Sequence, residues 1–481
     1  MRQHLLFFLF LMALPLTGYS NALQLTNMSV DQAAGTVTFD VEWRNSWRVS
    51  TVPFNWDAAW VFVKFRQCGS SPTTQWTHGQ VNTSVGAHSF GNLEPVLADG
   101  SGVGIDPAPE NLGVMLRRST VGVFPNAGAT TITLALSNLP GTGTDIDIKV
   151  FGVEMVFIPQ ESFALGGDGG GRQEWRGPTG TTNISSENAV TLQDGSQTYN
   201  VPASYPKGFD AYHIMKYEIS QGQYAAFMNT INATAQSAHY QGTNNRRHAL
   251  TNTGAPPNSF VSNREDRANN YMGWRDISAY LDWAALRPMS ELEYEKAGRG
   301  QGAVVVNEAA WGSTVLNNAQ TISSTSPPED GTEIIISPSN ANVAYSNVSY
   351  SGGDGGRGPL RVGIFAQPTD STREATGASY YGVMELSGNI YETVIPVSDN
   401  AMGVFQDVWG DGVLTSGGDH DVADWPGAGA FNTASDGNRW IGYRGGSYQS
   451  NDDRIRLADR YRVYWDPDRV DNRERGGRGV R

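Results

Sequence analysis

Side chains that could bind a metal ion or take part in catalysis are few and scattered in this chain. The densest group is Asp419-His420-Asp421 with Asp424, whose imidazole and carboxylates could hold a divalent cation. A solvated loop is the favoured interpretation, because one histidine among loop carboxylates has no fixed scaffold. The other histidines lack a ligand spacing such as HExxH, so the sequence contains no established motif for a catalytic metal.

Cys68 is the only cysteine, so the chain can form no internal disulfide. A single thiol also excludes zinc sites with two or more cysteine ligands and catalysis by a cysteine pair. A reactive nucleophile is one interpretation of Cys68. A cysteine that follows the apolar run WVFVKF is more typical of a small residue at a strand end.

Two further patterns could bind anions. The glycine-rich stretches GGDGGGR (166–172) and GGDGGRG (352–358) do not open a helix after a strand, as a phosphate-binding loop would, and flexible turns are favoured. Residues 439–481 contain 11 Arg against six Asp and one Glu, interleaved with aromatic residues. This segment could form a surface for an anionic glycan or peptide, but its mixed signs favour internal ion pairs.

The first 22 residues are typical of a cleaved signal peptide. Arg2 is followed by the 12-residue apolar run Leu5–Leu16, and Ser20 and Ala22 supply small residues at the −3 and −1 positions of a cleavage site. The alternative, a membrane anchor, needs about 20 apolar residues. We therefore expect a soluble chain that is secreted, periplasmic or at the cell surface, with no membrane span.

The overall charge argues against nucleic acid as a partner. Asp and Glu number 48 and Lys and Arg 34, which gives a net charge of −14. Affinity for a phosphate backbone comes from clustered positive charge, which an acidic chain with few lysines does not supply.

Residues 23–150 predict an all-β sandwich domain. Apolar residues alternate with polar ones in TVTFDVEW (36–43), the period-2 pattern of a half-buried strand. Turns rich in glycine, proline and asparagine separate the other candidate strands, as in a sandwich. These candidates are residues 59–66, 112–119, 130–139 and 145–153.

Residues 151–481 predict a loop-rich α+β domain. Ser220 with Gln223, and Ser290 with Glu293, fit capping boxes that open short helices, and residues 276–286 have apolar side chains at helical spacing. The change of pattern near 150–154 leaves no long linker, so we expect a short or shared strand there. We also expect residues 154–481 to fold alone.

Five segments of the second region occur in the order in which the formylglycine-generating enzyme family, also called the sulfatase-modifying factor domain, has matching segments. They are EMVFIPQESFALGGD (154–168), YEISQGQYAAFMN (217–229), WRDISAYLDWAALRPMSELEYEKAGRG (274–300), YYGVMELSGNIYETV (380–394) and YRGGSYQS (443–450). The closing GGRGVR resembles the family's terminal segment. The resemblance implies an α+β fold related to C-type lectins, often calcium-bound.

The family's enzyme holds copper with two cysteines that follow its RGGSY-like segment. In this chain those positions fall on Ser450 and Ile455. A hydroxyl and a sec-butyl group cannot form the thiolate pair that selects a soft, monovalent copper ion. We therefore expect no copper and no formylglycine-generating activity, although the sequence leaves open whether another enzymatic activity remains.

The resemblance also implies calcium. A first site would use the carboxylates of Glu385 and Glu392 with the carbonyls of Gly388 and Ile390, hard oxygen ligands that suit calcium. Ordinary loop charges are the alternative. A second site would use Asn342, the Val343 carbonyl, Asp354 and the Gly356 carbonyl, with no preference between site and loop.

The sequence therefore favours an exported, calcium-binding and non-catalytic protein that acts by binding at a surface or in an extracellular assembly. Its partner would be a glycan, a protein or a copy of itself. The alternative is a metal-dependent oxidoreductase of the same superfamily, acting on a peptide or small molecule. Fold alone does not decide between them.

Overall fold

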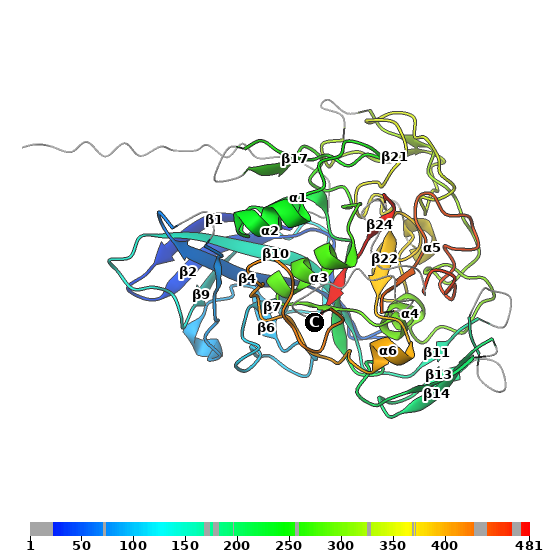
Figure 1. The fold of residues 1–481 in the computed structure, drawn as a ribbon, viewed down its shortest axis with the longest axis horizontal. Helices are drawn as coiled ribbons and strands as arrows, with labels where there is room; N and C mark the ends of the chain where they lie inside the picture. The colour runs from blue at the N-terminus through cyan, green and yellow to red at the C-terminus, as the bar shows by residue number, and fades with distance from the viewer. Residues whose placement is uncertain are drawn as a thin grey trace, which may run out of the picture.

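The computed structural model describes residues 23–481 apart from 71–73, 168–173, 177–181, 196, 255–258, 325–328, 368–369, 371, 428–439 and 464–472. The predicted signal peptide, most of the first glycine-rich stretch and part of the C-terminal arginine-rich segment lie outside the described residues. The chain is mostly strands and loops with few, short helices, as the loop-rich prediction requires (Figure 1).

Three strands of the N-terminal part form one sheet. Their order is β1 (Gln24–Asp31), β2 (Thr36–Glu42) and β9 (Thr130–Ala135). Burial alternates along β2, which confirms the predicted half-buried strand. Its buried residues Val37, Phe39 and Val41 share a core with Val61 and Val63 of β4 (Asp57–Gln67), a strand of the second sheet. The two sheets therefore pack face to face, although a separate sandwich domain stays a prediction.

The second sheet has eight strands and crosses the predicted boundary at residue 150. Its order is β19 (Arg287–Pro288), β25 (Gly479–Val480), β16 (Tyr212–Met215), β10 (Ile146–Ile158), β4, β7 (Val114–Arg118) and β6 (Leu93–Val96), with β5 (Thr77–His78) paired to β4. β10 pairs with β4 from Ile146 to Val156 and with β16 from Met155 to Ile158. One strand thus joins the N-terminal residues to the C-terminal ones.

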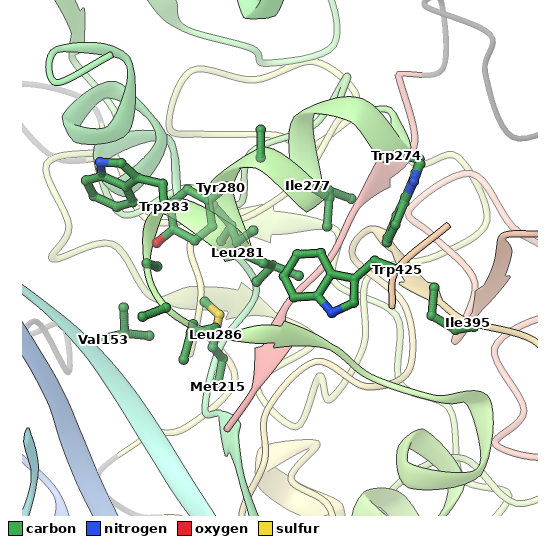
Figure 2. Close-up of a cluster of buried hydrophobic side chains, with 14 of the residues drawn as sticks. Val153, Met215, Trp274, Ile277, Tyr280, Leu281, Trp283, Leu286, Ile395 and Trp425 are labelled. Carbon is green, nitrogen blue, oxygen red and sulfur yellow. The ribbon is translucent and has the colours of Figure 1, made fainter. Parts of the chain in front are cut away.

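The other face of this sheet carries the largest apolar core. Trp60 and Phe62 of β4 pack there with residues of the later chain. Trp60 donates from Nε1 to the Ala284 carbonyl at 2.8 Å, and the Phe62 ring meets Trp283 edge-on at 5.2 Å between centroids. Figure 2 shows Val153, Met215 and Leu286 in the lower left part of this cluster and Trp283 at its upper left. The two parts of the chain therefore share a core as well as a strand.

Capping residues set the starts of the helices. The predicted capping boxes are confirmed at Ser220 with Gln223 and at Ser290 with Glu293. The predicted helix at 276–286 is present as α3, which begins two residues earlier and ends at Trp283. The α-helices are α1 (Gln221–Met228), α2 (Ala233–His239), α3 (Trp274–Trp283), α4 (Glu291–Arg299), α5 (Arg373–Thr376) and α6 (Asp399–Met402), with a 3-10 turn at Val85–Ala87.

Short sheets complete the loop-rich part, and β22 lies beside β24 in Figure 1. The groups are β3 (Ser46–Arg48) with β8 (Gly122–Phe124); β11 (Phe163–Leu165) with β13 (Thr182–Ile184); β12 (Trp175–Arg176), β14 (Val190–Asp194) and β15 (Gln197–Val201); β17 (Leu250–Asn252) with β18 (Phe260–Ser262); β20 (Thr321–Ile322) with β21 (Ile335–Ser337); and β23 (Gly442–Arg444), β22 (Tyr391–Val394) and β24 (Arg475–Gly476). Among the described residues, no helix has the length and apolar character needed to cross a membrane.

Candidate functional site

Ser450 and Ile455 stand at the positions that correspond to the family's two copper-binding cysteines. Both side chains are buried, and both contact other residues of the chain. Ser450 Oγ accepts a hydrogen bond from the Ser447 N–H at 2.9 Å and donates to the Tyr391 hydroxyl at 3.0 Å. Ile455 belongs to a small apolar cluster that includes Trp311 and Val343. Ser450 thus belongs to a network of hydroxyl groups, and Ile455 belongs to an apolar cluster beside it. Neither side chain is a soft metal ligand.

The hydroxyl network continues around Ser450. Ser447 donates from Oγ to the Glu474 carboxylate at 2.6 Å, and the Tyr448 hydroxyl donates to the Arg473 carbonyl at 3.0 Å. Burial raises the pKa of Tyr391 above its ordinary value, so the phenol stays protonated at neutral pH. These groups can position a polar ligand or water by hydrogen bonding.

The predicted first calcium site is a tight loop that leads into β22. Glu385, Gly388 and Asn389 have φ angles of 55°, 86° and 60°, all in the left-handed region. An added Cβ at Gly388 would come within 2.6 Å of the Ala344 carbonyl, so only glycine fits this approach. The loop therefore has the curvature with which backbone carbonyls and carboxylates can converge on a cation.

Each of the two carboxylates at this loop has one buried oxygen without a hydrogen-bond partner. Glu385 accepts from the Gly363 N–H at Oε1 (2.9 Å), and Glu392 accepts from Arg478 Nε at Oε1 (2.8 Å). Oε2 of Glu385 and Oε2 of Glu392 are buried and unpartnered. Burial raises the pKa of Glu385 to about 7. Unpaired buried carboxylate oxygens are costly, and a cation would satisfy them.

Two residues that sequence reasoning missed complete this cluster. Arg478 donates to Glu392 and to the carbonyls of Met215, Lys216 and Met384. Glu218 is fully buried and accepts from the Asn389 side chain and the Ile390 N–H. Both lie in segments that carry the family resemblance, 217–229 and 476–481, but they lie far from the loop in sequence, and neither was assigned a role at it.

The electrostatics of this cluster favour an added cation. Burial, together with the charges of Glu392 and Glu385, raises the pKa of Glu218 well above its ordinary value. Arg478 pairs with Glu392, and both Arg478 and Arg361 act electrostatically on Glu385, so these cations offset only part of the negative charge of the three carboxylates. A divalent cation would offset the rest, so the donor set fits calcium.

The predicted second calcium site has all four of its ligand groups engaged. Asn342 Oδ1 accepts from the Asn317 N–H, and the carbonyls of Val343 and Gly356 accept the Ala319 and Tyr350 N–H groups. The Asp354 carboxylate accepts from Arg264 Nε and Nη2, each at 2.6 Å, and from Arg267 at 2.7 Å. A cation would have to displace these contacts, so this donor set does not fit calcium as it stands.

The Asp419-His420-Asp421 group with Asp424 does not converge on one point. Asp419 pairs with Arg275, the buried His420 bonds through Nε2 to the Pro426 carbonyl at 3.0 Å, and Asp424 accepts from Gln406. Burial lowers the pKa of His420 to about 4. These contacts agree with the favoured interpretation of separate loop side chains.

Asp421 instead joins a group that sequence reasoning missed. Its carboxylate lies with those of Asp282 and Asp411 within 4.8 Å, the only set of three metal-ligating side chains this close among the described residues. Asp282, at the end of α3, already accepts N–H groups from Asp411 and Asp421 through its two oxygens. These backbone hydrogen bonds explain why Asp411 and Asp421 lie close to Asp282.

An arginine-lined pocket of about 580 Å³ lies beside Asp354. Its charged and polar lining includes Arg246, Arg247, His248, Arg267, Asp354 and Arg357. Nε of Arg246 and Nε of Arg267 are buried and have no hydrogen-bond partner among the described residues. The exposed Arg357 lines the same pocket and can donate to an anion from a positively charged side chain.

Backbone geometry holds two of these arginines in place. Arg246 and Arg247 have φ angles of 54° and 64°, which are uncommon for residues with a side chain. An added Cβ at Gly358 would come within 2.2 Å of the Arg246 carbonyl, so the two loops pack closely. Strain of this kind is concentrated at functional sites and ligand clamps.

The C-terminal arginines that the structure describes mostly form internal contacts. Arg444 and Arg460 pair with Glu291 of α4, Arg478 pairs with Glu392, and Arg481 pairs with Asp106. All four guanidinium groups are buried. These contacts agree with the favoured interpretation of the segment as a set of internal ion pairs.

The chain was compared with family models, curated proteins and solved structures. The family model described as the sulfatase-modifying factor enzyme 1-like domain matches residues 153–469. Among solved structures, the chain is similar to the one titled "Structure of PvdO from Pseudomonas aeruginosa", with 17% sequence identity, a TM-score of 0.34, and coverage of 68% of this chain and 94% of that chain. No curated protein matches the chain.

Proposed function

The chain belongs to the family of sulfatase-modifying factor enzyme 1-like domains, and we propose that it is an exported, calcium-stabilised and non-catalytic member that acts by binding an acidic glycan. The family match covers Ser447–Ser450, the loop from Glu385 to Glu392 and the arginine-lined pocket, and ends before Arg473, Glu474 and Arg478. Each part of the proposal has its own support.

The observation that carries the non-catalytic role is the state of Ser450 and Ile455. Ser450 is bonded to Ser447 and Tyr391, and Ile455 is packed against Trp311. Neither position supplies a thiolate, and the single cysteine, Cys68, lies on the N-terminal side of β10 in sequence and is exposed. Copper chemistry of the family's kind therefore has no ligands at this place.

The loop from Glu385 to Glu392 supports the proposal that the chain binds calcium. Its two carboxylates each keep one buried, unpartnered oxygen, and the surrounding groups carry an excess of negative charge. The Gly388 and Ile390 carbonyls would complete the oxygen set. In this proposal calcium has a structural role, because it would join the loop to β22 and, through Glu392, to Arg478.

The ligand class follows from the lining of the arginine-lined pocket. Four arginines, His248 and Asp354 line it, and Ala249 is its only apolar lining residue with a side chain among those described. Arg247 and Arg267 are paired with the buried Glu329, and Arg246 and Arg357 add further positive charge. Such a surface suits a hydrated, polar ligand that carries sulfate or carboxylate groups. An acidic oligosaccharide has this chemistry, and the arginines would bind its anionic groups bidentately.

A binding experiment with a matched variant tests this function. Sulfated and uronate-containing oligosaccharides should bind the exported chain, whereas neutral oligosaccharides of equal length should not. Arg357→Gln, which removes an exposed charge from the pocket, should weaken binding roughly tenfold, as for loss of one charged hydrogen-bonding group. Arg66→Gln on β4 removes the same charge elsewhere and should leave binding unchanged. Equal binding of neutral and acidic sugars would contradict the proposal.

A further inference from the structure

Leu23, the first described residue, lies beside a buried carboxylate where the two large sheets meet. Its backbone N–H donates a hydrogen bond to Glu154 of β10, and both residues line a cavity of about 130 Å³. An added Cβ at Gly152 would come within 2.5 Å of Leu23 Cδ2, so the leucine side chain covers this glycine. Gln24 pairs with Glu42 at the start of β1, which fixes the position of Leu23.

Glu154 shares its buried ammonium partner with a second carboxylate. Lys216 Nζ lies 3.3 Å from Glu154 Oε2 and 3.2 Å from Asp57 Oδ2. Asp57 also lies near the buried Arg118, whereas on its cavity side Glu154 accepts the Leu23 N–H. Burial raises the pKa of Glu154 to about 7, although Lys216 lowers it. A cationic group at the Leu23 nitrogen would therefore give Glu154 an ion pair that it does not share.

We propose that the mature chain begins at Leu23 and that its α-ammonium group binds the Glu154 carboxylate in this cavity. The proposal goes beyond the glycan-binding function and depends on the export proposed with it. Small residues at Ser20 and Ala22 place the cleavage directly before Leu23. A signal peptidase would hydrolyse the bond between the Ala22 carbonyl carbon and the Leu23 nitrogen. Water supplies the oxygen of the new Ala22 carboxylate, and the freed amine is protonated at neutral pH.

Cleavage changes the nature of the contact at Glu154. Before cleavage the Leu23 nitrogen is a neutral amide with one N–H, which Glu154 accepts. Afterwards it is an ammonium with three donors beside a carboxylate, so a full ion pair is added to the hydrogen bond. Glu154 then no longer depends on the Lys216 ammonium that it shares with Asp57. Removal of the signal peptide would thus complete the junction of the two sheets.

The first test locates the new terminus. The full precursor is exported by a host with a general secretion pathway, and the mature product is analysed by intact mass and N-terminal sequencing. The expected product begins at Leu23. A terminus at any other residue would overturn the proposal even if the chain is exported and binds glycan.

The second test asks whether a positive charge at the Leu23 nitrogen stabilises the folded chain, and distinguishes this effect from that of an added residue. Mature chains that begin at Leu23 are compared with chains carrying one added alanine before it and with chains acetylated at the Leu23 nitrogen. The free Leu23 terminus should melt a few degrees higher than both. In Glu154→Gln the differences should vanish, because the carboxylate that binds the ammonium is gone. Equal melting of all three wild-type chains would overturn the proposal.

A third measurement does not require the Glu154 variant to fold. The α-amine of an ordinary N-terminus has a pKa of about 7.7–8.0. Pairing with Glu154 should raise it, so labelling of the Leu23 amine should require a higher pH than labelling of the chain with the added alanine. An amine that labels with an ordinary pH profile would contradict the buried ion pair.

Discussion

At the scale of single residues, the contacts of Glu385, Glu392 and Arg478 determine how the loop proposed to bind calcium, residues 385–392, is held in this chain. Arg478 already neutralises one oxygen of Glu392, whereas Glu385 has only a backbone N–H as partner. Loss of Glu392 would leave a buried guanidinium without its carboxylate, which destabilises by itself. Glu385 is therefore the position at which the contribution of calcium can be separated from that of the ion pair.

Chelation should lower the melting temperature of the wild-type chain. A cation that binds only the folded state stabilises it by about 2.7 kcal/mol at 100 times its Kd. Glu385→Gln keeps an oxygen for the Gly363 N–H and removes the charge, so it should lose most of the response to a chelator. Glu265→Gln, outside the loop, should keep it. Thermal unfolding with and without chelator and added calcium measures this, and an unchanged wild-type curve would contradict the calcium site.

The effect of calcium should grow with pH. Burial raises the pKa of Glu385 to about 7 in the folded chain, from 4.5. Without calcium, the folded state keeps this proton more tightly than the unfolded state, so the group's stability contribution is present below pH 4.5 and is lost as pH rises through 7. Calcium would replace the proton.

The difference in melting temperature between calcium and chelator should therefore be small at pH 5 and large at pH 8. Glu154 titrates in the same pH range. Its effect on the melting temperature is the same with calcium and with chelator, so it cancels in the difference between the two. A calcium effect that is equal at both pH values would contradict the role of Glu385.

At the scale of elements, short-range signals in the sequence located several strands and helices, with starts that differ by one or two residues at 57, 114, 146 and 274. The alternation in residues 36–43 and the capping boxes at Ser220 and Ser290 act within a few residues and are confirmed. Arg478 and Glu218 could not be found in this way. They meet the loop at 385–392 only because β16 and β25 pair in the same sheet, a contact between residues more than 260 positions apart.

The same limit applies to the arginine-lined pocket. Sequence reasoning assigned Asp354 and Gly356 to a calcium site through the family resemblance, and saw the glycine-rich stretch as a flexible turn. In the structure this stretch packs against the loop of Arg246, and Asp354 binds two arginines. No local pattern marks that pairing, since Arg264 and Asp354 are separated by 90 residues.

Strand β10 leads us to revise the expectation that residues 154–481 fold alone. A fragment that begins at Glu154 would keep the pairing of Met155–Ile158 with β16 but lose β4, with Trp60 and Phe62 of the main core. The Arg481 guanidinium would also lose Trp60, over which it lies at 3.9 Å. We expect the fragment to be insoluble or to bind a hydrophobic dye without cooperative melting, while the mature chain melts cooperatively. A cooperative, monomeric fragment would contradict this.

At the scale of the whole molecule, a shared sheet joins an N-terminal set of strands to a family domain whose copper positions hold a serine and an isoleucine. In the functions proposed above, calcium, the Leu23 terminus and the shared core would stabilise the folded chain, whereas the arginine-lined pocket would bind the ligand. We expect the chain to lack the family's oxidation of cysteine, because neither position supplies a thiolate.

The most direct test is mass spectrometry of a cysteine-containing, sulfatase-type peptide incubated with the mature chain, copper and oxygen. Ser450→Cys with Ile455→Cys provides the reference, because two thiolates at these positions should bind Cu(I) whether or not turnover returns. We predict that the wild-type chain leaves the peptide thiol intact and binds no Cu(I) at this place. Conversion of the cysteine to an aldehyde by the unmodified, copper-loaded chain would contradict the account and favour the oxidoreductase alternative.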